Sequence, residues 1–202
     1  MHEGERFNVC SHLAAFVLAL AGAFVTGSAM LGDANRLKTA GVMIFAISVL
    51  VLYGASALFH GSRGAAKAFW QRVDHASIFL LIAATCTAFC LGTAPDVWDQ
   101  AALSVVWGMA AFGVCRELRA QDGASPSLVL YVAMGWIGVA VALRAATHLS
   151  VTGVALLLGG AAIYSLGTIF YRNRRGARHA HGVWHLFVMG GTACHYLAIA
   201  RL

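Results

Sequence analysis

The sequence predicts an all-α integral membrane protein, a bundle of seven transmembrane helices with the N-terminus in the cytoplasm and the C-terminus outside. Hydrophobic residues make up 60% of the 202 residues, charged residues make up only 11%, and the mean hydropathy is +0.75. This balance excludes an ordinary water-soluble domain. Apolar stretches of the length that crosses a bilayer, about 20 residues, also recur along the whole chain between short polar patches.

The apolar stretches follow one another closely, so they predict a single domain over residues 1–202. The predicted spans are Val9–Leu31, Thr39–Phe59, Asp74–Gly92, Trp98–Cys115, Pro126–Ala145, Leu149–Phe170 and His181–Ala200. The first span is interpreted as a retained helix and not as a signal peptide. Its apolar run is longer than a typical h-region, and Glu3 and Glu5 precede it where basic residues would be expected.

The basic residues predict the orientation, because Lys and Arg accumulate on the cytoplasmic side of a membrane. Ten of the fourteen fall at the N-terminus and in the second, fourth and sixth connections: Arg6, Arg63, Lys67, Arg72, Arg116, Arg119, Arg172, Arg174, Arg175 and Arg178. The other four are Arg36, Lys38, Arg144 and Arg201. The net charge of +6 therefore indicates topology and not nucleic-acid binding, since no aromatic residues alternate with the basic ones in a soluble module.

Two pairs of polar residues lie four positions apart near helix ends. His181 and His185 project from one face of the seventh span, an arrangement that commonly presents two imidazole nitrogens to one metal ion. Ser56 and His60 share a face at the end of the second span. The alternative for each histidine, considered by itself, is an interfacial side chain that water solvates.

Asp74 stands at the start of the third predicted span, where a carboxylate by default caps a helix and interacts with its dipole. The topology favours a second interpretation. The second span ends on the cytoplasmic side and the third and seventh begin there, so His60, Asp74, His181 and His185 share one membrane depth. Three imidazoles with an open fourth position are typical of catalytic zinc, and a nearby carboxylate can hold the attacking water.

Two further features surround this predicted zinc site. Glu5, Asn8 and His12 are spaced three and four residues apart on one face of the first helix. They are predicted to surround the metal ligands or to gate the site, and the alternative is a solvated helix start. His195 lies about 15 Å beyond His185 along the seventh helix, which is too far to share the metal ion, so we expect it to be hydrogen-bonded inside the bundle.

Four blocks of the sequence carry a family resemblance. They are E-R-F-N-V-C-S-H at Glu5 to His12, S-A-L-F-H at Ser56 to His60, V-D-H-A-S-I-F-L-L-I-A at Val73 to Ala83, and H-G-V-W-H-L-F-V-M-G-G-T-A-C-H at His181 to His195. These blocks resemble those of haemolysin III proteins, within the wider progestin and adipoQ receptor family, and the resemblance covers essentially the whole chain. A departure occurs at Ala84 to Phe89, where the family would have a Gly-Thr-Tyr-Thr-Pro-like sequence.

The resemblance implies that His60, His181 and His185 ligate zinc, with Asp74 and Ser56 as the catalytic residues beside the metal-bound water. It also implies a relation to alkaline ceramidases and a location in a bacterial inner (plasma) membrane. The predicted function is therefore a zinc-dependent hydrolase that takes a membrane lipid amide or ester at the cytoplasmic leaflet. The alternatives are a non-enzymatic regulator of membrane homeostasis or energetics, a pore-forming cytolysin, and a ligand receptor. Against a pore, the outer halves of the spans are almost wholly apolar.

Overall fold

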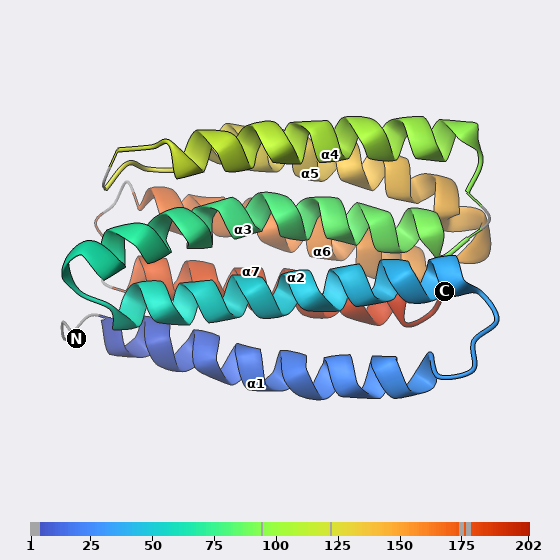
Figure 1. Ribbon diagram of the computed structural model, residues 1–202, viewed down its shortest axis with the longest axis horizontal. Helices are drawn as coiled ribbons and strands as arrows, with labels where there is room; N and C mark the ends of the chain where they lie inside the picture. The colour runs from blue at the N-terminus through green and yellow to red at the C-terminus, as the bar shows by residue number, and fades with distance from the viewer. Residues whose placement is uncertain (1–4, 94, 122, 174–175, 177–178) are drawn as a thin grey trace.

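The computed structural model describes residues 5–93, 95–121, 123–173, 176 and 179–202. Over these residues the chain forms seven α-helices, which run side by side along the long axis (Figure 1). The helices are α1 (Arg6–Ala29), α2 (Arg36–Gly61), α3 (Gly64–Leu91), α4 (Val97–Leu118), α5 (Leu128–Ala142), α6 (Val151–Arg172) and α7 (Ala180–Ile199), with a 3₁₀ segment, η2 (Leu143–His148), after α5. The prediction of an all-α bundle of seven helices is confirmed.

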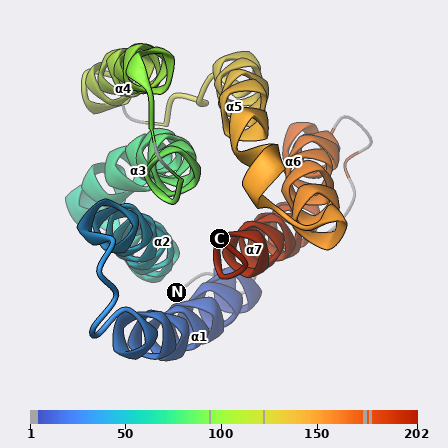
Figure 2. The same cartoon turned by 90° about the vertical axis from the view of Figure 1, so that its right-hand side faces the viewer.

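The helices form a ring in chain order when the bundle is viewed end-on (Figure 2). The ring closes because α7 contacts both α6 and α1. The interior holds two apolar clusters, one centred on Phe45, Phe89 and Leu157, the other on Phe79 and Met134, and all five of these side chains are almost fully buried. The buried residues of the second cluster come from α3, α4 and α5. Of the two clusters, only the first contains buried residues of α1 and α7.

The outer surface of the bundle is apolar, as lipid requires of a membrane protein. Large side chains such as Phe24, Leu18 and Phe112 are mostly exposed. Of the helices in the described part of the chain, α1, α2, α3, α4 and α6 are each long and apolar enough to cross a bilayer. The α5 helix has only 15 residues and is prolonged by η2. The α7 helix has 20 residues but carries three histidines, which lower its hydropathy. The structure is thus a helical membrane bundle.

The third helix begins ten residues earlier than predicted, at Gly64 and not at Asp74. The interpretation of Asp74 as a helix cap is therefore wrong, because this residue lies inside α3 and is buried. The extra turns contain Lys67 and Arg72. Because of these charges the segment does not stand out as an apolar stretch in the sequence, although its backbone is helical. The fifth helix is shorter than predicted: Ser127 caps its start, and the α-helix ends at Ala142, where the chain tightens into η2.

The start of α1, the end of α2 and the starts of α3 and α7 meet at one end of the bundle, on the left of Figure 1. We call this the histidine end. The topology predicted this shared position. Which side of a membrane the histidine end faces stays a prediction, and three of the residues used for it, Arg174, Arg175 and Arg178, lie outside the described residues.

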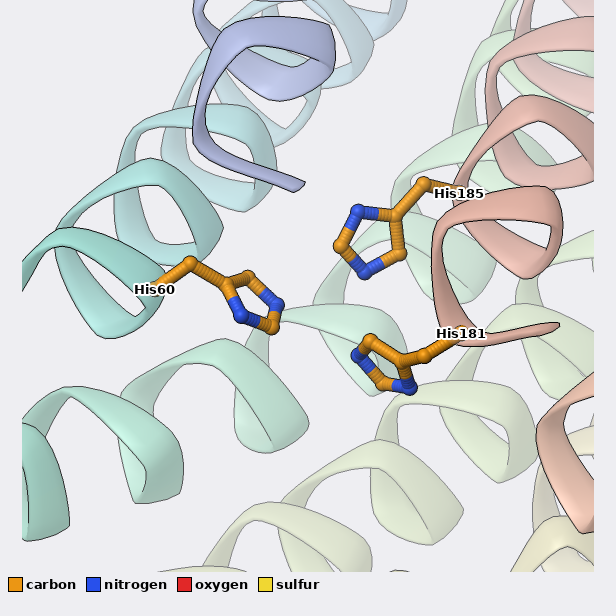
Figure 3. A group of neighbouring side chains, drawn as sticks. All are labelled: His60, His181 and His185. Atoms are coloured by element: carbon orange, nitrogen blue, oxygen red, sulfur yellow. The ribbon is translucent and has the colours of Figure 1, made fainter. Parts of the chain in front are cut away.

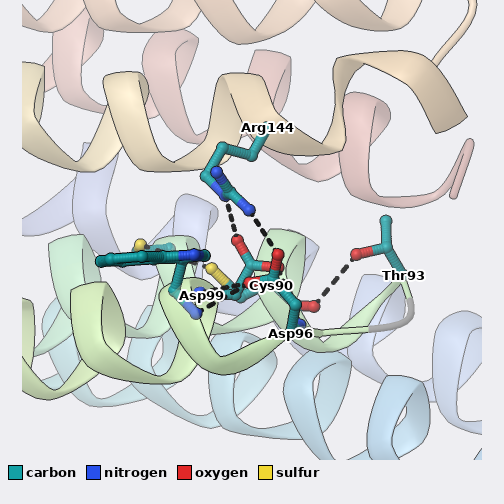
Figure 4. A network of polar contacts seen from close by, with 7 residues as sticks. Cys90, Thr93, Asp96, Asp99 and Arg144 are labelled. Carbon is teal, nitrogen blue, oxygen red and sulfur yellow. Dashed lines mark hydrogen bonds and ion pairs between the residues drawn. The ribbon is translucent and has the colours of Figure 1, made fainter.

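The opposite end of the bundle is tied by a polar network (Figure 4). Arg144 of η2 donates from Nε to Asp99 at 2.5 Å and from Nη2 to Asp96 at 2.7 Å. Asp96 and Asp99 also form the capping box that starts α4. The network therefore links the turn after α5 to the start of α4, far from the histidine end.

Candidate metal centre

Three histidines converge at the histidine end, one from the last turn of α2 and two from the first turns of α7. One ring nitrogen from each of His60, His181 and His185 lies within 4.8 Å of the others. The ring centroids are 4.6 to 5.1 Å apart, and Figure 3 shows the three rings turned toward one space. The two helices that carry them are not consecutive, so only the closed ring of helices brings the three side chains together.

The cluster is shielded from solvent. The exposed fraction is 3% for His60 and 2% for His185, and His181 is half-buried. Burial of this degree does not match the alternative in which water solvates these side chains at the interface. Two ring nitrogens, Nε2 of His60 and Nδ1 of His185, are buried without a hydrogen-bond partner among the described residues.

Unpaired buried nitrogens fit a metal ion. A buried polar atom without a partner costs about 1–3 kcal/mol, and native structures rarely leave one unexplained. Neutral imidazole nitrogen is among the commonest metal ligands in proteins. The cluster of His60, His181 and His185 could therefore hold a metal ion, and its chemistry suits the borderline-soft divalent metals.

Asp74 and Ser56 lie beside the cluster. Both line a small cavity of about 30 Å³ that His181 and His185 also line, and this volume is about the size of one water molecule. The Ser56 hydroxyl interacts with the Asp74 carboxyl, and both side chains are buried. Asp74 does not join the three histidines as a fourth close ligand. It lines the same water-sized cavity as His181 and His185.

The stripe on α1 also reaches the cluster. Oε2 of Glu5 lies 2.6 Å from Nδ1 of His60, and Glu5 also accepts from Asn8 at 3.0 Å and from Lys67 at 2.8 Å. Burial opposes the charge of Glu5, but these hydrogen bonds outweigh it and lower the pKa of its carboxyl to about 2. Asn8 is buried, so a fully solvated helix start is not what the structure has.

His12 is a fourth imidazole at the same place. Its ring centroid lies 3.9 Å from that of His185 in an edge-on contact, and 5.5 Å from that of Tyr53. Its exposed fraction is 3%, and neither ring nitrogen has a hydrogen-bond partner among the described residues. His12 also lines the small cavity, so α1 supplies part of the wall of the site.

A larger apolar cavity of about 100 Å³ adjoins the small one and runs between α2, α3, α5, α6 and α7. The two cavities share Leu52, Ile78, Tyr131, Trp184 and Val188 in their lining. His195 lines the large cavity, and its Nε2 is hydrogen-bonded to the Leu157 carbonyl at 3.1 Å. The expectation that His195 is hydrogen-bonded inside the bundle is confirmed.

One polar pair near the site was missed from the sequence. Nδ1 of His75 lies 3.7 Å from Oε2 of Glu117, and both side chains are buried. Glu117 sits at the end of α4 among basic residues, where it reads as an ordinary interfacial charge. Its shared depth with Asp74 and His75 is the signal that could have identified it.

The sequence of the chain is similar to those of known proteins. A family model described as Haemolysin-III related matches residues 2–196. The chain is 34% identical over 158 residues to the Hemolysin-3 homolog of Bacillus subtilis (strain 168), an alignment that covers 77% of this chain and 74% of that protein. It is 30% identical over 158 residues to Hemolysin-3 of Bacillus cereus, covering 77% and 72%. It is also 34% identical over 95 residues to the Monocyte to macrophage differentiation factor of Homo sapiens, covering 46% and 39%.

Proposed function

Because the chain belongs to the haemolysin-III related family, we propose that it is a zinc-dependent hydrolase embedded in the membrane, which cleaves an amide or ester bond of a lipid. One arrangement supports this function most. His60, His181 and His185 cluster closely enough to hold one metal ion, the last two line one water-sized cavity together with the buried Asp74, and that cavity adjoins an apolar cavity inside the bundle.

Zinc is the metal that these residues suit best. His60, His181 and His185 would hold it, since zinc is usually four-coordinate and catalytic sites supply three protein ligands with the fourth position open. When bound, zinc would supply Lewis-acid polarisation of a carbonyl group and a lowered pKa for water. A fourth protein ligand within the same distance is not found among the described residues, which favours an open site over a closed structural one.

Asp74 is the group that would take a proton from the attacking water. Asp74 of α3 lines the water-sized cavity together with His181 and His185 of α7. The Ser56 hydroxyl interacts with the Asp74 carboxyl and would hold it in orientation, as a hydrogen bond to a carboxylate does. A base placed in this way usually contributes about 10²–10⁴-fold to the rate.

A hydrocarbon chain is the occupant that the lining of the apolar cavity favours. Its lining is mainly aliphatic and aromatic, and it approaches the metal centre at Ile78, Tyr131 and Trp184. A hydrocarbon chain bound there would place its carboxyl derivative beside the three histidines. Lateral access is consistent with the lining, which includes Gly135 and Trp136 of α5 together with Ser165 of α6.

The whole chain acts as one domain in this proposal, in a bacterial inner (plasma) membrane with the histidine end toward the cytoplasm. The site then lies near the cytoplasmic leaflet, where lipid substrates enter from the side. Cytolysis, which the name of the relative Hemolysin-3 suggests, is a weaker candidate. The larger cavity of about 100 Å³ is lined mainly by apolar side chains, and an aqueous pore needs a polar lining.

The decisive experiment compares zinc content, thermal stability and hydrolysis of lipid amides and esters for purified wild type and Asp74→Asn. The variant keeps the shape of the side chain but loses the carboxylate that accepts the proton. Zinc content and folding should stay close to wild type, and the rate should fall by about 100-fold or more. Asp99→Asn, the same change at the opposite end of the bundle, is the matched control and should keep the rate.

Two results would contradict the proposal in different ways. Undiminished hydrolysis by Asp74→Asn would exclude Asp74 as the base. No hydrolysis by zinc-loaded wild type across a broad panel of lipid amides and esters would instead favour a metal that only ties α2 to α7, and with it a non-enzymatic role in the membrane.

A further inference from the structure

We infer that Glu5 is a positioning residue for the metal centre: it fixes His60 in the tautomer that binds metal and thereby couples the docking of α1 to metal binding. This inference rests on the metal site of the proposed function but not on hydrolysis. The observation behind it is the contact of 2.6 Å between Oε2 of Glu5 and Nδ1 of His60. The other ring nitrogen of His60 is buried and has no partner among the described residues.

The chemistry of the two groups decides which nitrogen carries the proton. An ionised carboxylate only accepts hydrogen bonds, and Glu5 has the surroundings of one, because it accepts from the Lys67 ammonium at 2.8 Å and from the Asn8 amide at 3.0 Å. Nδ1 of His60 must therefore be the donor in this contact. In the neutral imidazole Nε2 then carries the lone pair, and Nε2 is the buried nitrogen that lacks a partner.

Glu5 is itself held in place. Lys67 of α3 donates to Oε1 of Glu5 at 2.8 Å, and Asn8 of α1 donates to Oε2 at 3.0 Å. The Lys67 ammonium also lies 4.8 Å from the centre of the Phe59 ring, next to His60. The carboxylate is thus fixed by α1 and α3 while it contacts α2. A ligating histidine whose other nitrogen donates to such a carboxylate is more basic and better oriented, and losing the carboxylate typically costs 10–100-fold in metal affinity.

The same contact holds the start of a helix whose surface is otherwise mostly exposed. Only 11% of the membrane-spanning window of α1 is buried, and a crevice of about 410 Å³ separates its middle from α2 and α7. At the histidine end α1 is close to α7, because Phe7 fills the space that a Cβ on Gly182 would occupy. Gly182 lies between the ligands His181 and His185. Docking of the start of α1 and formation of the metal site therefore share the same few residues.

The test measures zinc affinity by competition with a chelator, using the full-length protein in detergent or nanodiscs. Glu5→Ala should weaken zinc binding about 10–100-fold. Glu5→Gln should weaken it less, because the amide oxygen can still accept from Nδ1 of His60. Lys67→Met is the graded comparison: it removes one of the two groups that hold Glu5 in place and leaves the contact with His60, so it should weaken zinc binding less than Glu5→Ala does.

Hydrogen exchange tests the coupling from the other direction. Linkage requires that, if α1 docking strengthens zinc binding, zinc strengthens α1 docking by the same factor. Zinc should slow exchange of the second-turn amides of α1, the first that are hydrogen-bonded within the helix, in wild type and have a smaller effect in Glu5→Ala. Thermal unfolding of the metal-free variants shows whether each is folded, and Glu5→Gln gives a second reading should Glu5→Ala fail to fold.

Each contrary result has a distinct meaning. Equal zinc affinity in wild type, Glu5→Ala and Glu5→Gln would overturn the inference, as would an equal loss in Lys67→Met, which would point to general loosening of the site. Wild type that binds no zinc would overturn both this inference and the proposed metal site. Wild type that binds zinc as expected but hydrolyses no lipid would contradict only the proposed hydrolase activity and would leave this inference intact.

Discussion

The Tyr131 hydroxyl donates a hydrogen bond of 2.8 Å to the backbone carbonyl of His75. This bond ties α5 to α3 one residue after Asp74, and Tyr131 lines both the small cavity and the apolar cavity. The two cavities thus meet at a side chain whose polar end is already satisfied. The apolar part of the Tyr131 ring lines both cavities.

Replacement of Tyr131 by Phe tests this tie. The variant keeps the ring and loses one hydrogen bond, so the free energy of unfolding should fall by about 1 kcal/mol. Tyr171→Phe is the matched control, because Tyr171 also lines the small cavity and its hydroxyl makes no hydrogen bond among the described residues. Thermal or denaturant unfolding in detergent measures both, and an equal loss in the two variants would contradict the role given to the Tyr131–His75 bond.

The three-histidine cluster is the part of the site that the sequence predicts best. His181 and His185 are linked by helical spacing, and His60 is linked to them by the topology of the spans. The sequence predicts that Asp74 lies at the same end of the bundle as the histidines, but it predicts the wrong position within the helix. Asp74 lies inside α3 and does not begin it. Contacts such as Glu5 with His60 could not be predicted, because residues 55 positions apart in sequence meet through helix rotation and tilt.

Removal of any one of the three histidines should release the metal. His60→Ala, His181→Ala and His185→Ala should each lose most of the bound zinc, because a three-ligand site rarely survives with two ligands. Elemental analysis of the purified proteins measures this. His195→Ala is the matched control: it is a buried histidine of the same helix, it should lose some stability, and it should keep its zinc. Full zinc content in all three ligand variants would exclude the cluster as the metal site.

The apolar cavity could not be predicted from composition, because every span is rich in small and aliphatic residues and none of these patterns distinguishes a packed interior from a hollow one. The cavity results from the three-dimensional position of residues such as Gly135, Gly138 and Ala142 of α5. Their spacing is as consistent with close helix packing as with a cavity.

Filling the cavity tests whether it holds a lipid chain. A side chain at Gly135 would meet no atom within 4 Å at its Cβ, so Gly135→Leu should fold and occupy space inside the cavity. The variant should shift preference toward lipids with shorter chains, with hydrolysis of long-chain substrates reduced about tenfold, since one or two methylenes in an apolar pocket are worth about 1–3 kcal/mol. Gly108→Leu, at an exposed and equally open position of α4, is the control and should leave the chain-length profile unchanged.

Orientation is the last expectation, and the placement of the site at the cytoplasmic leaflet depends on it. The start of α1 and the end of α7 lie at opposite ends of the bundle (Figure 1), so an N-terminus in the cytoplasm requires a C-terminus outside. A periplasmic reporter such as alkaline phosphatase, fused after Leu202, should be active, and a fluorescent protein that folds only in the cytoplasm should be dark at the same position. Fusion of both reporters after Arg119, next to the end of α4 at the histidine end, should give the reverse pattern. Cytoplasmic fluorescence after Leu202 would invert the bundle, and the metal centre and its lipid substrate would then belong to the outer leaflet.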